Sequence, residues 1–202
     1  KIPELHRSET ETSDDDQEKL NQTWEAATDG SLKNGELGIG IYLRSTLDGH
    51  EKRIAAGIEA RITEISSYRA ELAAVTVMIS RLEIYDDIHW VMDNQAAYDI
   101  IVEMLTGKIF SGRDLVNMEC RSLIMGIQRQ IKRHRGKMTV KWIRSHREDK
   151  DTKDDTLREQ RNMLAVADAL ADQGRSQEDN FPEFPMTMTT GNLHYLTKKI
   201  NR

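Results

Sequence analysis

The sequence predicts one mixed α/β domain whose sheet opens with an antiparallel meander and continues through parallel crossovers. Three observations predict this fold class. Three strand-like apolar segments follow one another near the start, separated by short turns. Helix-like and strand-like segments then alternate up to about residue 174. The chain has 202 residues, 38% of them hydrophobic, which is enough for a single packed core.

The first three strands are expected over residues 22–30, Leu37–Leu43 and 53–62, where small and branched apolar residues recur. Asp29 comes at the end of the first of these segments and is followed by a glycine-containing stretch that is typical of a turn.

The later elements are expected in the order helix, strand, helix, helix, strand, helix, over residues 66–83, 88–93, 94–105, 113–134, 138–145 and 158–174. Ser66 or Ser67 is a candidate N-cap for the first helix, and Gly174 is a candidate C-terminal glycine for the last. Ligands of open α/β sheets gather beyond the carboxyl ends of strands.

Both ends of the chain differ in composition from the domain, which is expected over residues 23–174. Residues 1–22 hold seven acids and three Lys or Arg, which predicts a disordered acidic tail. Residues 175–202 contain prolines and a polar run, which predicts a C-terminal extension or linker.

Composition narrows the class of protein. Cys120 is the single cysteine, so no disulfide forms within the chain, and a reducing intracellular location, cytoplasm or nucleus, is expected. No apolar run approaches the ~18 residues of a membrane span, so no membrane association is expected. The formal charge is −5, yet residues 129–150 hold nine Lys or Arg and two acids, a local stretch that can attract a polyanion.

Four acids lie at or within these elements: Asp29, Glu71, Asp93 and Asp168. Singly, each has an ordinary interpretation, as a turn residue, a helix-dipole partner, an N-cap and a solvent-facing helix residue. Together, they can converge at one edge of the sheet, where carboxylates repel unless a cation neutralises them. Magnesium prefers carboxylate oxygens, and two such ions support phosphoryl transfer.

Five motifs occur in order: "TDGS" at Thr28, "YRAEL" at Tyr68, "VMDNQ" at Val91, "VKWIRSH" at Val140 and "ADALADQG" at Ala167. Over residues 23–174, this series resembles type 1 ribonuclease H, and it is most similar to the ribonuclease H domains of retroelement reverse transcriptases. The resemblance implies a ribonuclease H-like fold with a five-stranded mixed sheet flanked by helices.

The resemblance also implies an activity. Asp29, Glu71, Asp93 and Asp168 would bind two Mg²⁺ ions, with Mn²⁺ as a substitute, for endonucleolytic hydrolysis of the RNA strand of an RNA/DNA hybrid. The products would carry 5′-phosphate and 3′-hydroxyl ends. His146 matches a family histidine that assists proton transfer or product departure. A solvent-exposed loop histidine is the alternative.

Substrate contacts follow from the same resemblance. Gly30, Ser31 and Gln95, together with Glu71, would face the minor groove of the hybrid, where the 2′-hydroxyl distinguishes RNA from DNA. Three residues of the first helix match positions that grip the DNA strand: Ser67, Tyr68 and Arg69. Tyr68 departs from the Asn or Thr common there. A fused or associated reverse transcriptase is the implied protein partner.

Four features depart from the family pattern or stay open. Asp172, one helical turn after Asp168, is a rival for the fourth acid. The basic stretch over residues 129–141 either binds phosphates or places cations at a helix C-terminus. The charged loop over residues 147–160 has no assigned role, and residues 105–114 lack the tryptophan-bearing basic protrusion of some family members.

The sequence therefore favours a ribonuclease H. One alternative is a non-catalytic module of the same fold that binds nucleic acid or serves as a scaffold in a larger assembly. A second is a nuclease of the same superfamily that acts on DNA junctions or in transposition, which the "TDGS" and "DNQ" motifs fit less well.

Overall fold

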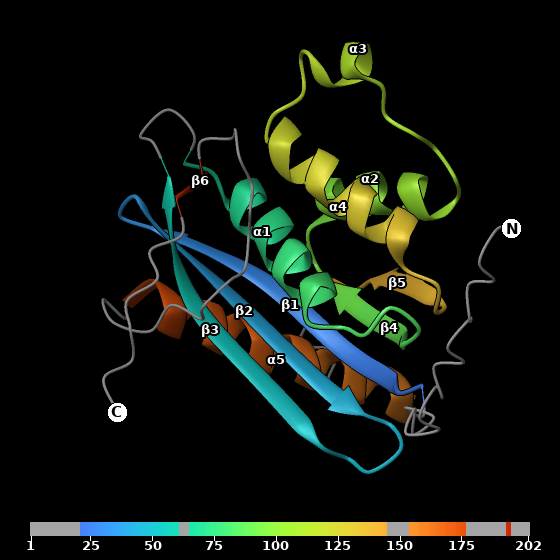
Figure 1. Ribbon diagram of the computed structural model, residues 1–202. Helices are drawn as coiled ribbons and strands as arrows, with labels where there is room; N and C mark the ends of the chain where they lie inside the picture. The colour runs from blue at the N-terminus through green and yellow to red at the C-terminus, as the bar shows by residue number, and fades with distance from the viewer. Residues whose placement is uncertain (1–20, 61–64, 145–153, 177–192, 195–202) are drawn as a thin grey trace, which may run out of the picture.

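The structure is a computed structural model that describes residues 21–60, 65–144, 154–176 and 193–194. The elements form three layers, with one sheet between helices α1, α2 and α4 on one face and helix α5 on the other (Figure 1). None of the helices in these ranges is both long and apolar enough to span a bilayer.

The sheet confirms the fold class that the sequence predicts. Its five main strands are β1 (Thr23–Lys33), β2 (Glu36–Ser45), β3 (Glu51–Ala60), β4 (Asp87–Met92) and β5 (Met138–Trp142). They lie in the order β5-β4-β1-β2-β3. The first three strands pair antiparallel, whereas β4 pairs parallel to both β1 and β5. A two-residue strand, β6 (Leu193–His194), pairs with the edge of β3.

Strand β1 is longer than expected, and this changes the setting of Asp29. The turn that joins β1 to β2 lies five residues later, at Asn34 and Gly35, which both have positive φ angles of 54° and 83°. Such an Asn-Gly pair is typical of a tight β-hairpin. Asp29 is therefore a residue of the strand, paired with Gly40, and its expected position at a strand end is wrong.

Helices α1 (Ser67–Ser80) and α2 (Gln95–Leu105) begin at polar caps. The Ser66 hydroxyl accepts a hydrogen bond from the Arg69 amide at 3.2 Å, and the Asn94 side chain accepts one from the Ala97 amide at 3.0 Å. Asn94 takes the capping role that Asp93 was also a candidate for, so the Asp93 carboxylate is not needed there.

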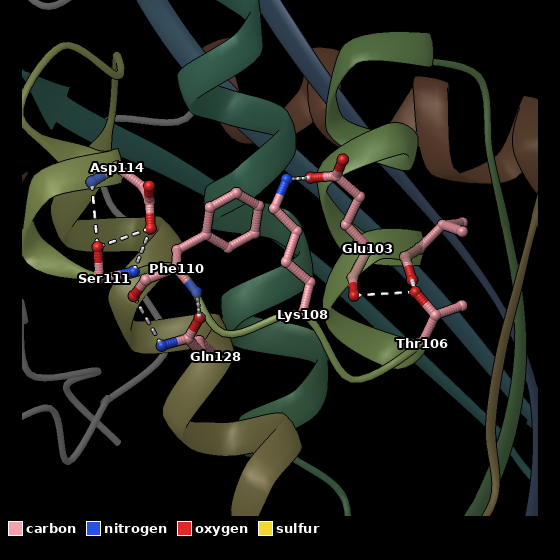
Figure 2. A network of polar contacts seen from close by, with 8 residues as sticks. Glu103, Thr106, Lys108, Phe110, Ser111, Asp114 and Gln128 are labelled. Carbon is pink, nitrogen blue, oxygen red and sulfur yellow. Dashed lines mark hydrogen bonds and ion pairs between the residues drawn. The ribbon is translucent and has the colours of Figure 1, made fainter.

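The single helix expected over residues 113–134 is wrong, because the structure divides it into α3 (Gly112–Leu115) and α4 (Arg121–Arg133). Ser111 and Asp114 form a capping box around the short α3, and Cys120 has a left-handed φ of 57° that interrupts the helical path. Gln128 of α4 accepts from the Phe110 amide at 2.7 Å, which ties this connection to α4 (Figure 2).

Helix α5 (Asp155–Ser176) covers β1, β2 and β3 on the face opposite α1. Its first turns replace the end of the loop expected up to residue 160. Gly174 lies inside this helix, so its expected place after the helix end is wrong. A Cβ at Gly174 would lie 2.5 Å from the Ala56 amide nitrogen, and the glycine therefore serves the close approach of α5 to β3.

Two apolar clusters hold the layers together. The larger lies between the sheet and helices α1, α2 and α4, and includes the fully buried Trp90, Leu72 and Ile124. The smaller lies under α5 and includes Val91 and Leu164. Because both faces of the central strands are covered, these strands are held rigidly at the edge where the acidic residues gather.

Candidate active site

Strand register places two of the acids side by side. The parallel ladder between β1 and β4 pairs Ala27 with Val91. Two residues further along each strand come Asp29 and Asp93. Asp93 directly follows Met92, the last residue of β4, whereas β1 continues past this point only in its pairing with β2. The two carboxylates therefore lie side by side at the carboxyl end of β4, as expected for an α/β site.

Glu71 reaches the same point from helix α1, which packs closely against β1. A Cβ at Gly30 would lie 2.4 Å from the Glu71 amide nitrogen, so only glycine permits this approach. Carboxylate oxygens of Asp29, Glu71 and Asp93 all lie within 4.8 Å of one another. The glycine of "TDGS" thus places the second helical turn of α1 beside the strand.

Burial and mutual repulsion raise the pKa values of Asp29 and Glu71. Burial, followed by the charges of Asp93 and Asp168, raises the pKa of Asp29 from 3.8 to about 7. Burial and the charge of Asp29 raise the pKa of Glu71 well above its usual value. Both carboxyls therefore keep their protons to a higher pH than an exposed acid does, which is typical of a site that binds a cation or exchanges a proton.

Asp168 and Asp172, both on α5, have different surroundings. Asp168 is exposed, lines the same groove as the three clustered acids and contributes to the raised pKa of Asp29. Asp172 accepts hydrogen bonds from Ser31 at 2.6 Å and from Arg175 at 2.9 Å, and these contacts lower its pKa. The Asp172 carboxylate is thus engaged in a surface network beside the site.

An open groove of about 660 Å³ exposes the acids to solvent. Four residues that sequence reasoning did not assign to the site also line it: Leu32, Asn94, Trp142 and Arg144. The signal that could have found Trp142 is strand register, because Trp142 pairs with Met92 and so ends β5 beside Asp93. Arg144 supplies a positive charge at the rim of an otherwise acidic groove.

The substrate-binding residues named from the resemblance are distributed unevenly. Gly30, Ser31 and Ser67 line the groove. The exposed Gln95 lies directly after Asn94, and its side chain donates to Asp99 at 2.7 Å. The remaining two residues, Tyr68 and Arg69, are partly or fully buried.

Tyr68 packs partly buried against the larger apolar cluster, and Arg69 is only 5% exposed. Their DNA-strand contacts stay predictions. His146 lies outside the described residues, as do the acidic tail up to residue 20 and most of the loop after His146.

The donor set suits a divalent cation. Glu71 Oε2 is buried and has no hydrogen-bond partner among the described residues. A buried, unpartnered carboxylate oxygen is costly, and its cost is offset when it ligates a metal. All the ligand atoms are hard oxygens, which suits Mg²⁺ or Mn²⁺ rather than a thiolate-seeking metal.

No model of a known protein family matches the chain, and no curated protein matches it. Solved structures do. The prototype foamy virus protease-reverse transcriptase is 18% identical with a TM-score of 0.56, over 78% of this chain and 21% of that one. LC11-RNase H1, isolated from compost by a metagenomic approach, is 16% identical with a TM-score of 0.50, over 76% of this chain and 95% of that one.

A third structure, RNase H1 from the halophilic archaeon Halobacterium salinarum NRC-1, is 16% identical over 75% of this chain and 96% of that one, with a TM-score of 0.49. The chain spans about a fifth of the foamy virus chain. Likeness at these identities concerns the fold. The chain has a ribonuclease H-like fold, with a cluster of three acids at the carboxyl end of its central strands.

Proposed function

We propose that the protein is a ribonuclease H that hydrolyses the RNA strand of RNA/DNA hybrids endonucleolytically. One observation carries the proposal: on a ribonuclease H-like fold, carboxylate oxygens of Asp29, Glu71 and Asp93 lie within 4.8 Å of one another in an open groove. Asp168 faces the same groove. A bound cation would offset the repulsion among these carboxylates.

Asp29, Glu71, Asp93 and Asp168 would hold two Mg²⁺ ions, or Mn²⁺ in their place. When bound, such ions polarise a phosphodiester, lower the pKa of an attacking water and stabilise the leaving oxygen. The protein contributes position. Asp29 is held by strand pairing, Asp93 directly follows the last residue of β4, and Glu71 is held by the contact of α1 with Gly30. Rigid elements of this kind keep ligands preorganised.

The groove also suits a duplex substrate. It is shallow and open rather than enclosed, and its rim combines the cation of Arg144 with the aromatic ring of Trp142. Ser31 and the Gly30 backbone lie next to the acids, where a ribose of the cleaved strand would pass. A contact with a 2′-hydroxyl at this point would select an RNA strand. The proposed substrate is therefore an RNA/DNA hybrid rather than a DNA duplex. A reverse transcriptase, fused or associated, is the proposed protein partner.

The test uses the whole chain with labelled RNA/DNA, RNA/RNA and DNA/DNA duplexes in Mg²⁺, Mn²⁺ or EDTA. We expect cleavage of the RNA strand of the hybrid alone, in either metal, with 5′-phosphate and 3′-hydroxyl ends, and none in EDTA. Asp29→Asn should retain the folded state and lose cleavage. Asp48→Asn, at an exposed turn far along the sheet, is the matched control.

Two results would contradict the proposal. Hybrid binding without cleavage in either metal would favour the non-catalytic module of the same fold. Cleavage of DNA duplexes or branched DNA in preference to the hybrid would favour a DNA-directed nuclease of the superfamily.

A further inference from the structure

The indole of Trp142 contacts the backbone of one of the clustered acids. Trp142 is the last residue of β5, and its Nε1–H donates a hydrogen bond to the main-chain oxygen of Asp93 at 2.8 Å. The ring is 36% exposed and lines the groove. A tryptophan donor is thus aimed at the backbone of a clustered acid, not at solvent.

Asp93 occupies a place where the regular ladder has ended. Strand β4 ends at Met92, whose oxygen accepts a hydrogen bond from the Ile143 amide at 2.9 Å, and helix α2 begins three residues later, at Gln95. Asn94 between them caps that helix. Asp93 is therefore the first residue of a two-residue link between strand and helix, and the indole bonds to its main-chain oxygen.

We propose that Trp142 is a positioning residue that fixes the Asp93 carboxylate in the metal-binding arrangement; this rests on the proposed function. If the hydrogen bond from the indole N–H is lost, the peptide group after Asp93 can rotate toward the open groove. The Asp93 carboxylate then changes its orientation as well. Hydrogen bonds that orient metal ligands from behind typically change metal affinity by about 10- to 100-fold when removed.

The chain offers a matched control in Trp24. Its Nε1–H also donates a hydrogen bond, to Asp86 at 3.1 Å, but at the amino end of β1. Five residues of extended strand separate Trp24 from Asp29, roughly 17 Å. Trp24→Phe removes the hydrogen bond from an indole to a carboxylate but changes no residue of the groove. It therefore shows whether losing an indole hydrogen bond elsewhere in the fold alters Mn²⁺ binding.

The test measures Mn²⁺ binding by the electron paramagnetic resonance of free Mn²⁺, in the absence of nucleic acid. The variants are Trp142→Phe, which keeps a ring but loses the donor, Trp142→Leu, which loses both, and Trp24→Phe. We expect Phe and Leu at position 142 to weaken Mn²⁺ binding similarly, by about tenfold or more. Trp24→Phe should bind Mn²⁺ as the wild type does. Thermal unfolding in EDTA verifies that each variant is folded.

A second measurement separates positioning from direct substrate contact. Trp142→Phe keeps an aromatic ring in the groove, so its loss of RNA/DNA hybrid binding in EDTA should be smaller than its loss of Mn²⁺ binding. Unchanged Mn²⁺ affinity in Trp142→Phe, or a loss seen only with Trp142→Leu, would overturn the positioning role while hybrid cleavage by the wild type still supported the proposed function. A wild type that neither binds Mn²⁺ nor cleaves the hybrid would overturn both.

Discussion

Asp29 is 8% exposed and has three further carboxylates around it, so its protonation couples to the stability of the fold. An acid whose folded-state pKa is raised keeps its proton in the folded state after the unfolded chain has released it. The folded state is then favoured at low pH, and this advantage disappears as the pH rises. The same sign holds for Glu71.

The first prediction concerns this coupling in metal-free buffer. The free energy of unfolding should fall as the pH rises from about 4 to about 7, the window between the ordinary pKa of Asp29 and its raised value. Asp29→Asn removes the contribution of Asp29 to this loss. The free energy of unfolding of the variant should therefore rise relative to that of the wild type, by up to about 4 kcal/mol across the window. Urea unfolding in EDTA at several pH values measures the gain.

Asp48 provides a control of opposite sign, because hydrogen bonds lower its pKa. The free energy of unfolding of Asp48→Asn should not rise relative to that of the wild type as the pH rises. A constant difference between Asp29→Asn and the wild type would contradict the raised pKa. At pH 8, Mn²⁺ should stabilise the wild type and leave Asp29→Asn unchanged, because the metal binds the ionised carboxylate of the folded state.

The second prediction separates Asp168 from Asp172. Asp168→Asn should reduce hybrid cleavage on the order of a hundredfold or more, as expected when charge stabilisation at the reacting phosphate is lost. Asp172→Asn should retain cleavage within about tenfold, since its carboxylate is engaged by Ser31 and Arg175. Initial rates with labelled hybrid at saturating Mg²⁺ decide between them. The reverse ranking would make Asp172 the fourth ligand.

At the residue scale, sequence reasoning found the acids and missed their neighbours. Asp29, Glu71 and Asp93 were predicted to converge because their motifs follow strands or open a helix, and the structure brings them together. Trp142 and Arg144 lie in a motif that was read only for the resemblance. Their place in the groove depends on how far β5 runs beside β4, and pairing length is set by tertiary packing.

At the scale of elements, the packing of α5 on the sheet fixes the position of Asp168. Gly38 and Gly40 of β2 lie under the helix, where a Cβ would meet the main chain of α5. Each glycine lets the helix backbone approach the strand closely, and Ala167 and Ala171 are fully buried at this contact. The small residues of β2 and α5 therefore determine how close α5 lies to the sheet, and so where Asp168 lies in the groove.

The third prediction tests this contact. A Cβ at Gly40 would lie 1.9 Å from the Ala167 oxygen and 2.4 Å from the Ala171 nitrogen, and backbone atoms cannot rotate away. Gly40→Ala should lower the free energy of unfolding by about 3 kcal/mol or more. Gly112→Ala, where a Cβ meets nothing within 4 Å, should change it by less than about 0.5 kcal/mol. Urea unfolding followed by circular dichroism compares them, and equal stabilities would refute the packing argument.

The order of elements followed from the sequence, whereas several of their ends did not. Periodicity predicted helix throughout residues 113–134, since the apolar residues of α3 and α4 continue one pattern. The break depends on the left-handed φ of Cys120, which a sequence pattern does not reveal for a non-glycine residue. Gly174 was read as a helix terminator because glycine commonly has that role, but here it serves helix-to-sheet contact.

At the scale of the whole molecule, the basic stretch at the end of α4 is separated from the groove. The basic stretch runs through the last turn of α4, which holds Lys132 and Arg133, to Lys137 before β5. The groove lies at the other end of β5, a five-residue strand that spans roughly 16 Å. Cations in the last turn of α4 complement the helix dipole, whatever their role toward nucleic acid. Arg144, by contrast, lines the groove itself.

The fourth prediction follows from this separation. Neutralising Arg144 as Arg144→Gln should lower the slope of log affinity against log salt by about 1, because one phosphate contact and its released counterion are lost. Neutralising Arg133, Arg135 and Lys137 together should leave the slope nearly unchanged for a hybrid of one helical turn seated at the groove. Fluorescence anisotropy in EDTA between low and physiological salt measures both slopes. A loss of about 2 or more in the triple variant would instead extend the hybrid path along β5 to the end of α4, and would assign the basic stretch to phosphate binding.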